Sequence, residues 1–164
     1  MVKVGDFFPV ECDCNLQDIN GNIVRVSDIL KFPAVIFFYP KDFTPGCTQE
    51  VCGFRDNYDA ILSLGFNLYA INADSPGLHK RFVHFYKINY PVYSDKDKKL
   101  LKMVGILNEK KMFGRKYYGI TRSTFVVDGN GIIRAIWGEI DGSMGKINTM
   151  THANQVLDFL KTLK

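Results

Sequence analysis

Short apolar runs alternate with longer amphipathic stretches along this chain, which is typical of an α/β protein. The runs at 34–39 and 66–73 are apolar almost throughout, and this favours central strands that are covered on both faces. Residues 123–128 and 132–137 flank the turn sequence DGNG and predict an antiparallel hairpin. We therefore expect a mixed β-sheet.

Amphipathic segments between these runs predict helices, and end signals place them. Gly65 is suited to follow a helix C-terminus, and Ser75 with Pro76 suits a helix start. Residues 11–16 and 22–26 flank the turn sequence QDING and predict a hairpin near the N-terminus. The expected fold class is α/β, with a central mixed β-sheet flanked by helices and an N-terminal β-hairpin. The expected helices span about 45–64, 76–88, 96–104 and 149–163.

The segment 105–119, GILNEKKMFGRKYYG, is the longest stretch that we expect to be irregular. Its three glycines and a cluster of basic residues interrupt the patterning. Loops of this length are often functional.

Composition adds few constraints. With 164 residues, of which 46% are hydrophobic, residues 1–164 are expected to form a single domain around one core. The 21 basic and 17 acidic residues are scattered, so we expect neither a nucleic-acid nor a membrane partner. No signal-peptide pattern is present, and we expect a cytoplasmic protein. Structural disulfides are rare there, so the four cysteines need a chemical explanation.

Cys47 lies where a helix is expected to begin. Thr44 is a preferred N-cap residue and Pro45 suits the first helical position, which makes Cys47 the third. Free backbone N–H groups and the helix dipole stabilise an anion in the first turn, so we expect the thiolate to be favoured. The Thr44 hydroxyl can lie beside the sulfur or can act as a cap only.

The residues around Cys47 resemble a known active site. Pro40, Thr44 and Cys47 reproduce the Pro-x-x-x-Thr-x-x-Cys motif of peroxiredoxins, and FTPGCTQEVCGFRD is similar to the bacterioferritin comigratory protein (PrxQ) branch. YPVYSD at 90–95 and GITRSTFVVDGNG at 119–131 extend the resemblance over nearly the whole chain. It implies a thioredoxin-like fold and thiol-dependent reduction of hydrogen peroxide and alkyl hydroperoxides.

The resemblance also implies roles for single residues. Cys47 matches the peroxidatic cysteine, whose thiolate attacks the peroxide and becomes a sulfenic acid. Thr44 matches the hydroxyl that hydrogen-bonds sulfur and peroxide, Pro40 the residue that shields the pocket, and Arg122 the active-site arginine. Glu50 falls on an acidic position that is usual in this branch, although it equally suits a first-turn helix charge.

Cys52 occupies the position of the resolving cysteine in many members of this branch. Five residues of ideal helix separate the two Cα atoms by about 9 Å, whereas a disulfide requires a Cα–Cα distance of no more than about 7 Å. Cys47 and Cys52 can therefore bond only after the helix unwinds locally. The alternative for Cys52 is an inert core thiol.

Cys12 and Cys14 depart from the family pattern. In a strand they point to the same face, which leaves open metal ligation, perhaps together with the other two cysteines. We expect them to be structural or incidental, and a secondary redox role stays open. The histidines, His79, His84 and His152, are not placed in sequence to serve as a base for Cys47.

The resemblance implies electrons from a thioredoxin-like or other protein disulfide reductant. We expect no cofactor and no metal, because no Rossmann glycine motif and no evident haem or flavin site is present. An internal resolving cysteine favours a monomer over the larger rings that some relatives form, and leaves a dimer open. Competing interpretations are a general disulfide oxidoreductase and a structural zinc or interaction module built on the four cysteines.

Overall fold

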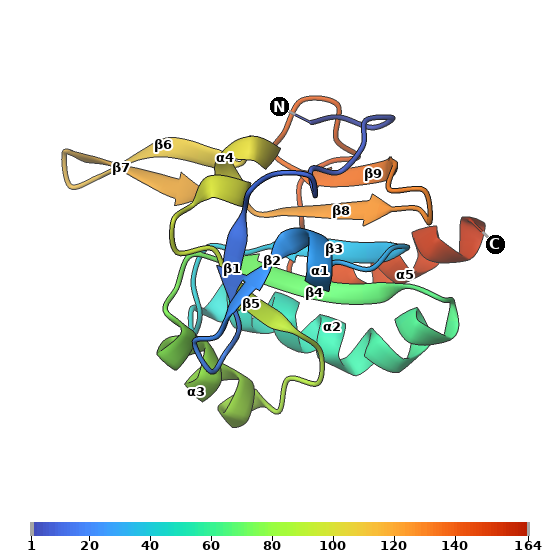
Figure 1. The fold of residues 1–164 in the computed structure, drawn as a ribbon, viewed down its shortest axis with the longest axis horizontal. Helices are drawn as coiled ribbons and strands as arrows, with labels where there is room; N and C mark the ends of the chain where they lie inside the picture. Colours follow the sequence, from blue (N-terminus) through green and yellow to red (C-terminus); the bar gives the residue numbers. More distant parts are fainter. Residues whose placement is uncertain (1, 164) are drawn as a thin grey trace.

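A seven-stranded mixed sheet forms the centre of the molecule in the computed structural model, which describes residues 2–163 (Figure 1). Strands β3, β4 and β5 run parallel, and the remaining neighbours pair antiparallel. This arrangement confirms the expected mixed sheet. In spatial order the strands are β2 (Ile23–Arg25), β1 (Asn15–Gln17), β5 (Val92–Ser94), β4 (Asn67–Asn72), β3 (Ala34–Phe38), β8 (Ser123–Val127) and β9 (Ile133–Gly138).

Helices cover both faces of this sheet. Alternate residues of β3 enter different cores, with Phe37 on one face and Ile36 on the other. The face of Phe37 is covered by α2 (Pro45–Ser63), α3 (Pro76–Tyr86) and α5 (His152–Thr162), and the opposite face by α1 (Val26–Ile29) and α4 (Lys99–Val104). Within residues 2–163, no helix combines the length and apolarity that crossing a bilayer requires.

The predicted helices are present, with ends shifted by a few residues. The Ser75 hydroxyl accepts a hydrogen bond from the backbone N–H of Leu78 at 3.2 Å, so this residue caps α3 as expected. Strand β1 is shorter than the expected strand at 11–16. It begins at Asn15, so Cys12 and Cys14 lie outside the strand. Two short elements, α1 and β5, were not predicted, since each is too short to show a hydrophobic period.

The expectation of an irregular segment at 105–119 is wrong. The chain forms a two-stranded antiparallel hairpin there, made of β6 (Leu107–Met112) and β7 (Arg115–Ile120), which projects from the body (Figure 1). Phe113 and Gly114 form its turn with positive φ angles of 52° and 75°. Asn or Asp is the usual first residue of such a turn. Because phenylalanine stands there instead, the sequence lacks the signal that predicts a hairpin.

Candidate active site

A buried polar network fixes the loop that joins β3 to α2. The Asp42 carboxylate accepts a hydrogen bond from the Tyr39 hydroxyl at 2.5 Å and lies 2.5 Å from Nδ1 of His79. The backbone N–H of Asp42 donates to Asp74 Oδ2 at 2.8 Å. Burial, reinforced by Asp42, holds the pKa of Tyr39 well above its usual range. Sequence analysis gave His79 no role, because its partner lies 37 positions away.

Cys47 lies in the first turn of α2, as predicted. Thr44 has the extended conformation of an N-cap residue and Pro45 is the first helical residue. The sulfur is almost completely enclosed, since Cys47 is only 1% exposed. The Thr44 hydroxyl donates to the carbonyl of Lys41 at 2.8 Å and makes no side-chain cap hydrogen bond. In this state Thr44 therefore engages its own loop.

Arg122 connects the sulfur to a carboxylate. Its Nη2 donates to Cys47 Sγ at 3.2 Å, and its Nη1 donates to Glu50 Oε1 at 2.6 Å. Arg122 comes from the segment between β7 and β8, whereas both partners lie on α2. The structure thus brings together three residues that the sequence separates by up to 75 positions.

Gly138 allows this arginine to take its place, and sequence analysis missed it. A Cβ atom at Gly138 would lie 2.4 Å from the carbonyl oxygen of Arg122, and the residue has a φ of 129°. Only glycine fits both the backbone conformation and the contact. A lone glycine at the end of an apolar strand was the available signal.

Glu50 is a carboxyl group that burial makes unusually basic. Burial raises its pKa to about 7, although the neighbouring Arg122 lowers it. Oε2 of Glu50 is buried without a hydrogen-bond partner among the described residues. A proton can therefore reside on this carboxyl group near neutral pH.

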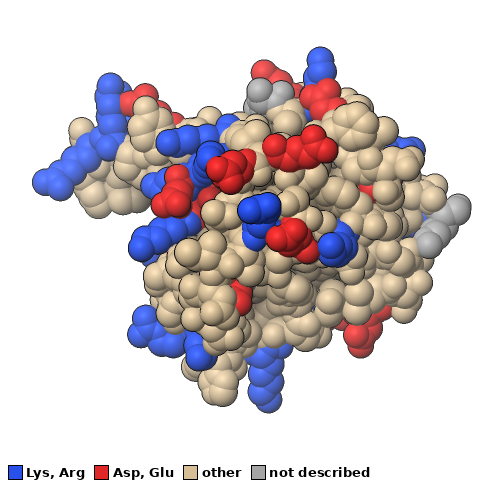
Figure 2. Space-filling view, viewed as in Figure 1, with Lys and Arg blue, Asp and Glu red and all other residues tan. Residues whose placement is uncertain are grey.

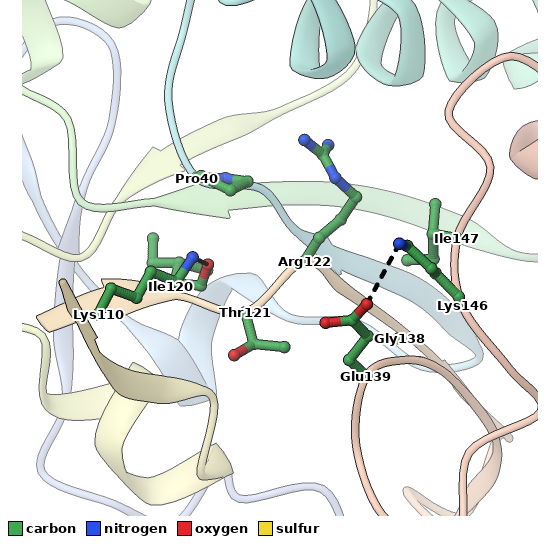
Figure 3. Close-up of a pocket in the computed structure, with 9 residues that line it drawn as sticks. All are labelled: Pro40, Lys110, Ile120, Thr121, Arg122, Gly138, Glu139, Lys146 and Ile147. Carbon is green, nitrogen blue, oxygen red and sulfur yellow. Dashed lines mark hydrogen bonds and ion pairs between the residues drawn. The ribbon is translucent and has the colours of Figure 1, made fainter. Parts of the chain in front are cut away.

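A cavity of about 260 Å³ opens beside Arg122 (Figure 3). Pro40 lies on its wall, and Glu139 forms an ion pair of 3.4 Å with Lys146 at another side. Cys47 is not among the lining residues, whereas Arg122 is. A small polar molecule in this cavity would therefore meet the guanidinium before the sulfur. The complete lining is Pro40, Lys110, Ile120, Thr121, Arg122, Gly138, Glu139, Lys146 and Ile147.

Cys52 is half-buried on the same unbroken helix as Cys47, and both thiols are free. Burial raises the pKa of Cys52, partly opposed by the positive charge of Arg55. The thiol form is therefore favoured while the helix is intact.

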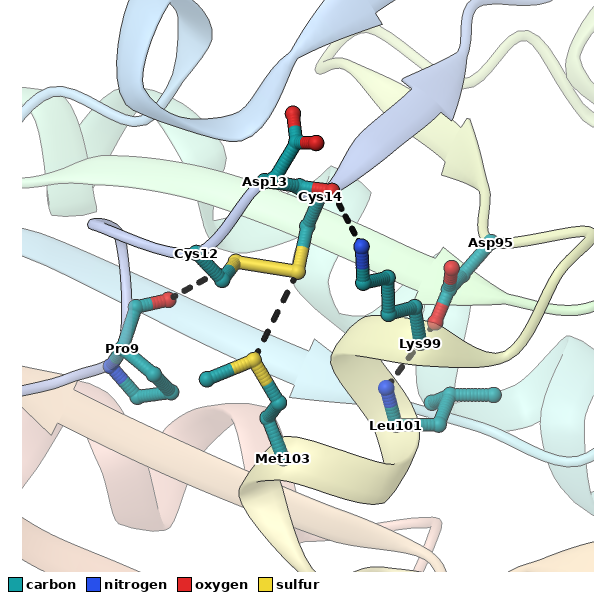
Figure 4. Close-up of a disulfide and its surroundings, with 8 residues drawn as sticks. All are labelled: Pro9, Cys12, Asp13, Cys14, Asp95, Lys99, Leu101 and Met103. Carbon is teal, nitrogen blue, oxygen red and sulfur yellow. Dashed lines mark hydrogen bonds between the residues drawn. A yellow bond between two sulfur atoms is a disulfide. The ribbon is translucent and has the colours of Figure 1, made fainter.

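Cys12 and Cys14 are joined by a disulfide (Figure 4). Cys14 is fully buried, and its sulfur lies 3.6 Å from Sδ of Met103. This pair contacts the core on the opposite face of the sheet from Cys47. The four cysteines therefore do not converge on one metal, and residues 2–163 contain no group of three or more His, Cys, Asp or Glu arranged to hold one.

Comparisons with known sequences place the chain among thiol peroxidases. Residues 4–136 match the model of the AhpC/TSA family. A putative peroxiredoxin bcp of Coxiella burnetii is 34% identical over 148 residues, which cover 89% of this chain and 96% of that protein. Peroxiredoxin Bcp of Escherichia coli is 32% identical over 160 residues, which cover 98% and 96%.

Solved structures agree with this placement. The bacterioferritin comigratory protein of Xanthomonas campestris, studied for its alkyl peroxide reduction activity, matches with a TM-score of 0.83, 28% identity and 99% coverage of each chain. Peroxidoxin BcpB of Mycobacterium tuberculosis matches with a TM-score of 0.82 and 27% identity, covering 100% of this chain and 99% of that one. These likenesses confirm the thioredoxin-like fold.

Removing the Asp42 carboxylate should destabilise the protein. Asp42→Ala leaves His79 and the Tyr39 hydroxyl buried without their partner, and we expect the free energy of unfolding to fall by about 3 kcal/mol. Urea denaturation measures this change. Asp56→Ala, at a side chain that is 65% exposed, is the control and should change stability by less than ~0.5 kcal/mol. Equal effects of the two variants would contradict a structural role for the network.

Adding a methyl group at Gly138 should displace Arg122. Gly138→Ala places a Cβ against the Arg122 carbonyl, and we expect it to lower the free energy of unfolding by ~2 kcal/mol or more and to slow peroxide consumption. Gly142→Ala is the matched control, because Gly142 also has a positive φ, of 79°, but has no atom within 4 Å of the added Cβ. Its cost should be about 1 kcal/mol from backbone strain alone, with normal activity. Identical behaviour of both variants would rule out the contact.

The buried carboxyl group should make stability depend on pH. The pKa of Glu50 is about 7 in the folded protein against an ordinary value of 4.5, so the folded state holds more protons between these values. Relative to Glu50→Gln, the free energy of unfolding of the natural protein should therefore fall as pH rises from about 4.5 to about 7. The total fall should be on the order of 3 kcal/mol. Urea denaturation at a series of pH values tests this, and parallel curves for the two proteins would contradict it.

Proposed function

This chain belongs to the AhpC/TSA family and is a peroxiredoxin, a thiol-dependent peroxidase, and we propose that Cys47 is its peroxidatic cysteine. The observation that carries the assignment is the hydrogen bond of 3.2 Å from the Arg122 guanidinium to the Cys47 sulfur. A permanent cation beside a thiol in the first turn of a helix favours the thiolate, which is the reactive form. Cys52, the other free cysteine, lies beyond the first turn of α2, and burial raises its pKa despite the positive charge of Arg55.

The first step is attack of the Cys47 thiolate on a peroxide oxygen. The S–O bond forms as the O–O bond breaks, which converts the thiolate to a sulfenic acid and releases an alkoxide or hydroxide that takes up a proton. Negative charge moves onto the departing oxygen, and a fixed guanidinium stabilises that charge without reorganising. Arg122 lines the cavity and contacts the sulfur, so one guanidinium can interact with both the nucleophile and a peroxide that enters the cavity.

Three neighbours support this step. Pro40 forms part of the cavity wall and limits access of water to the reacting atoms. Glu50 orients Arg122 through the hydrogen bond at 2.6 Å. Thr44 can donate to a bound peroxide only if its hydroxyl leaves the Lys41 carbonyl, so we infer that substrate binding changes this partner.

The second step requires α2 to open. Cys52 attacks the Cys47 sulfenic acid, a disulfide forms and water leaves. The two residues lie five apart in an intact helix, at a Cα separation of about 9 Å that no disulfide spans. We therefore propose that the segment around Cys47 unwinds after oxidation, bounded by Gly46 and Gly53, which adopt non-helical conformations readily.

The third step returns the enzyme to its dithiol form. A thioredoxin-like or similar protein dithiol reduces the Cys47–Cys52 disulfide by two thiol–disulfide exchanges and becomes a disulfide itself. Hydrogen peroxide and alkyl hydroperoxides are the proposed substrates, and the proposed working form is a cytoplasmic monomer. A general disulfide oxidoreductase is less well supported, because such enzymes present both thiols within bonding reach in the folded state.

Replacing Cys52 should separate oxidation from turnover. In Cys52→Ser, we expect steady-state peroxide consumption with a thioredoxin-type donor to fall by roughly tenfold or more, because the sulfenic acid has no internal thiol to condense with. A single round of Cys47 oxidation should keep its rate, which is measured as the disappearance of the free Cys47 thiol. The double variant Cys12→Ser/Cys14→Ser is the control and should retain turnover. Normal turnover of Cys52→Ser would exclude the resolving role.

A further inference from the structure

The hairpin of β6 and β7, residues 107–120, is here termed the arm, and its outer part, residues 111–118, is covered on neither face. It projects from the body of the molecule (Figure 1), and every residue from Lys111 to Tyr118 is exposed. Large apolar side chains are exposed as well, with Phe113 at 98%, Tyr118 at 64% and Met112 at 55%. A two-stranded hairpin is only marginally stable by itself, and clustered exposed apolar groups mark contact surfaces.

The residue at the tip is unfavourable for the turn that it makes. Phe113 and Gly114 both have left-handed backbone conformations, with φ of 52° and 75°. Glycine adopts this conformation freely, but a bulky aromatic residue does so at an energetic cost. Because the Phe113 side chain is 98% exposed, no packing within the chain offsets that cost. The residue is therefore better explained by a contact outside the protein.

Positive charge surrounds this apolar tip. The arm holds Lys110, Lys111, Arg115 and Lys116 but only one acidic residue, Glu109, in a chain whose net charge is +4. Lys111 lies directly opposite Lys116, and Lys116 pairs with Glu109 at 3.5 Å, so this one carboxylate offsets only part of the positive charge of the arm. Figure 2 shows Lys and Arg side chains on the projecting arm.

The basic residues point to both sides of the arm. Side chains alternate along a strand and opposed residues share a face, so Lys111 and Lys116 lie on one face and Lys110 and Arg115 on the other. A partner that packed against one face would leave the charges of the other face unused. The distribution fits end-on contact with an extended anionic surface that also accepts the apolar tip.

We propose that the arm docks end-on to an anionic lipid bilayer, with Phe113 and Met112 in the interfacial region and Lys111, Arg115 and Lys116 at the lipid headgroups. Apolar side chains that enter the interface beside Lys and Arg are the combination by which proteins bind such surfaces reversibly. This proposal revises the expectation that the chain has no membrane partner. That expectation rested on scattered charge, whereas the hairpin gathers three basic side chains, Lys111, Arg115 and Lys116, around one apolar tip.

Docking at the tip leaves the candidate active site accessible. The cavity lies at the base of the arm, where Lys110 and Ile120 belong to its lining. Strands of this length reach about 20 Å, so the cavity stays clear of the headgroups. The peroxidase would then act on hydroperoxides that leave the bilayer. The docking itself does not depend on the peroxidase chemistry.

Sedimentation with lipid vesicles tests the proposal on the full chain. The natural protein should sediment with vesicles of phosphatidylcholine and phosphatidylglycerol, but not with phosphatidylcholine alone, and high salt should release it. Phe113→Asn should bind these vesicles at least about fivefold more weakly, while its thermal midpoint stays the same or rises, because asparagine suits the left-handed turn. Lys111→Gln/Lys116→Gln should lose roughly fivefold in affinity per charge removed.

Matched controls come from α3, which lies away from the arm in Figure 1. Phe85→Ser removes an aromatic side chain that is 71% exposed, and Lys80→Gln/Arg81→Gln removes two exposed charges, so all three substitutions should leave vesicle binding intact. Every variant should consume tert-butyl hydroperoxide in solution at the normal rate.

Failure of the natural protein to bind anionic vesicles, or unchanged binding of Phe113→Asn, would overturn the proposal. Arm variants that instead slow reduction by a protein dithiol, with no lipid binding, would assign the arm to a protein partner.

Discussion

The Arg122 guanidinium holds two groups that can each carry a negative charge, the Cys47 sulfur and the Glu50 carboxyl. One half-buried cation cannot balance two buried anions, because isolated charge is costly away from water. Burial raises the pKa of Glu50 to about 7, so a proton on this carboxyl group relieves the conflict near neutral pH. A proton on the carboxyl group leaves the guanidinium free to balance the thiolate. The chemistry of the site therefore depends on the placement of a single arginine.

The backbone around Arg122 is built to hold that placement. Gly138 lets β9 pass so close to the Arg122 carbonyl that no side chain fits between them. The network of Asp42, His79 and Tyr39 fixes the loop that leads to Thr44. These contacts immobilise the approach to Cys47, which preorganises the site and limits the energy that is lost in reorganisation during the reaction.

The helix that follows the loop meets a different requirement. Asp42, before Thr44, is tied to the sheet by a buried hydrogen bond from Asn72 of β4, whereas the turns that carry Cys47 and Cys52 must open if the two sulfurs are to meet. The second cysteine pair plays no part in this movement, since Cys12 and Cys14 lie on the other face of the sheet and are already bonded. Their disulfide closes a very short loop, and stabilisation by a cross-link grows with loop length. It therefore contributes less stability than a disulfide that closes a long loop.

The sequence by itself determined the local features of this protein. The apolar strands, the start of α2 at Pro45 and the position of Cys47 in its first turn follow from patterns that span a few residues. Arg122 and Glu50 were found through a family resemblance, which carries tertiary information that no local pattern holds. Tertiary structure alone decided which groups meet: the pairing of Asp42 with His79, the contact of Gly138 with Arg122, and the hairpin at 107–120. The physical reason is range, because helix starts and strand alternation depend on neighbouring residues, whereas burial and cross-strand contact join residues that are far apart in the chain.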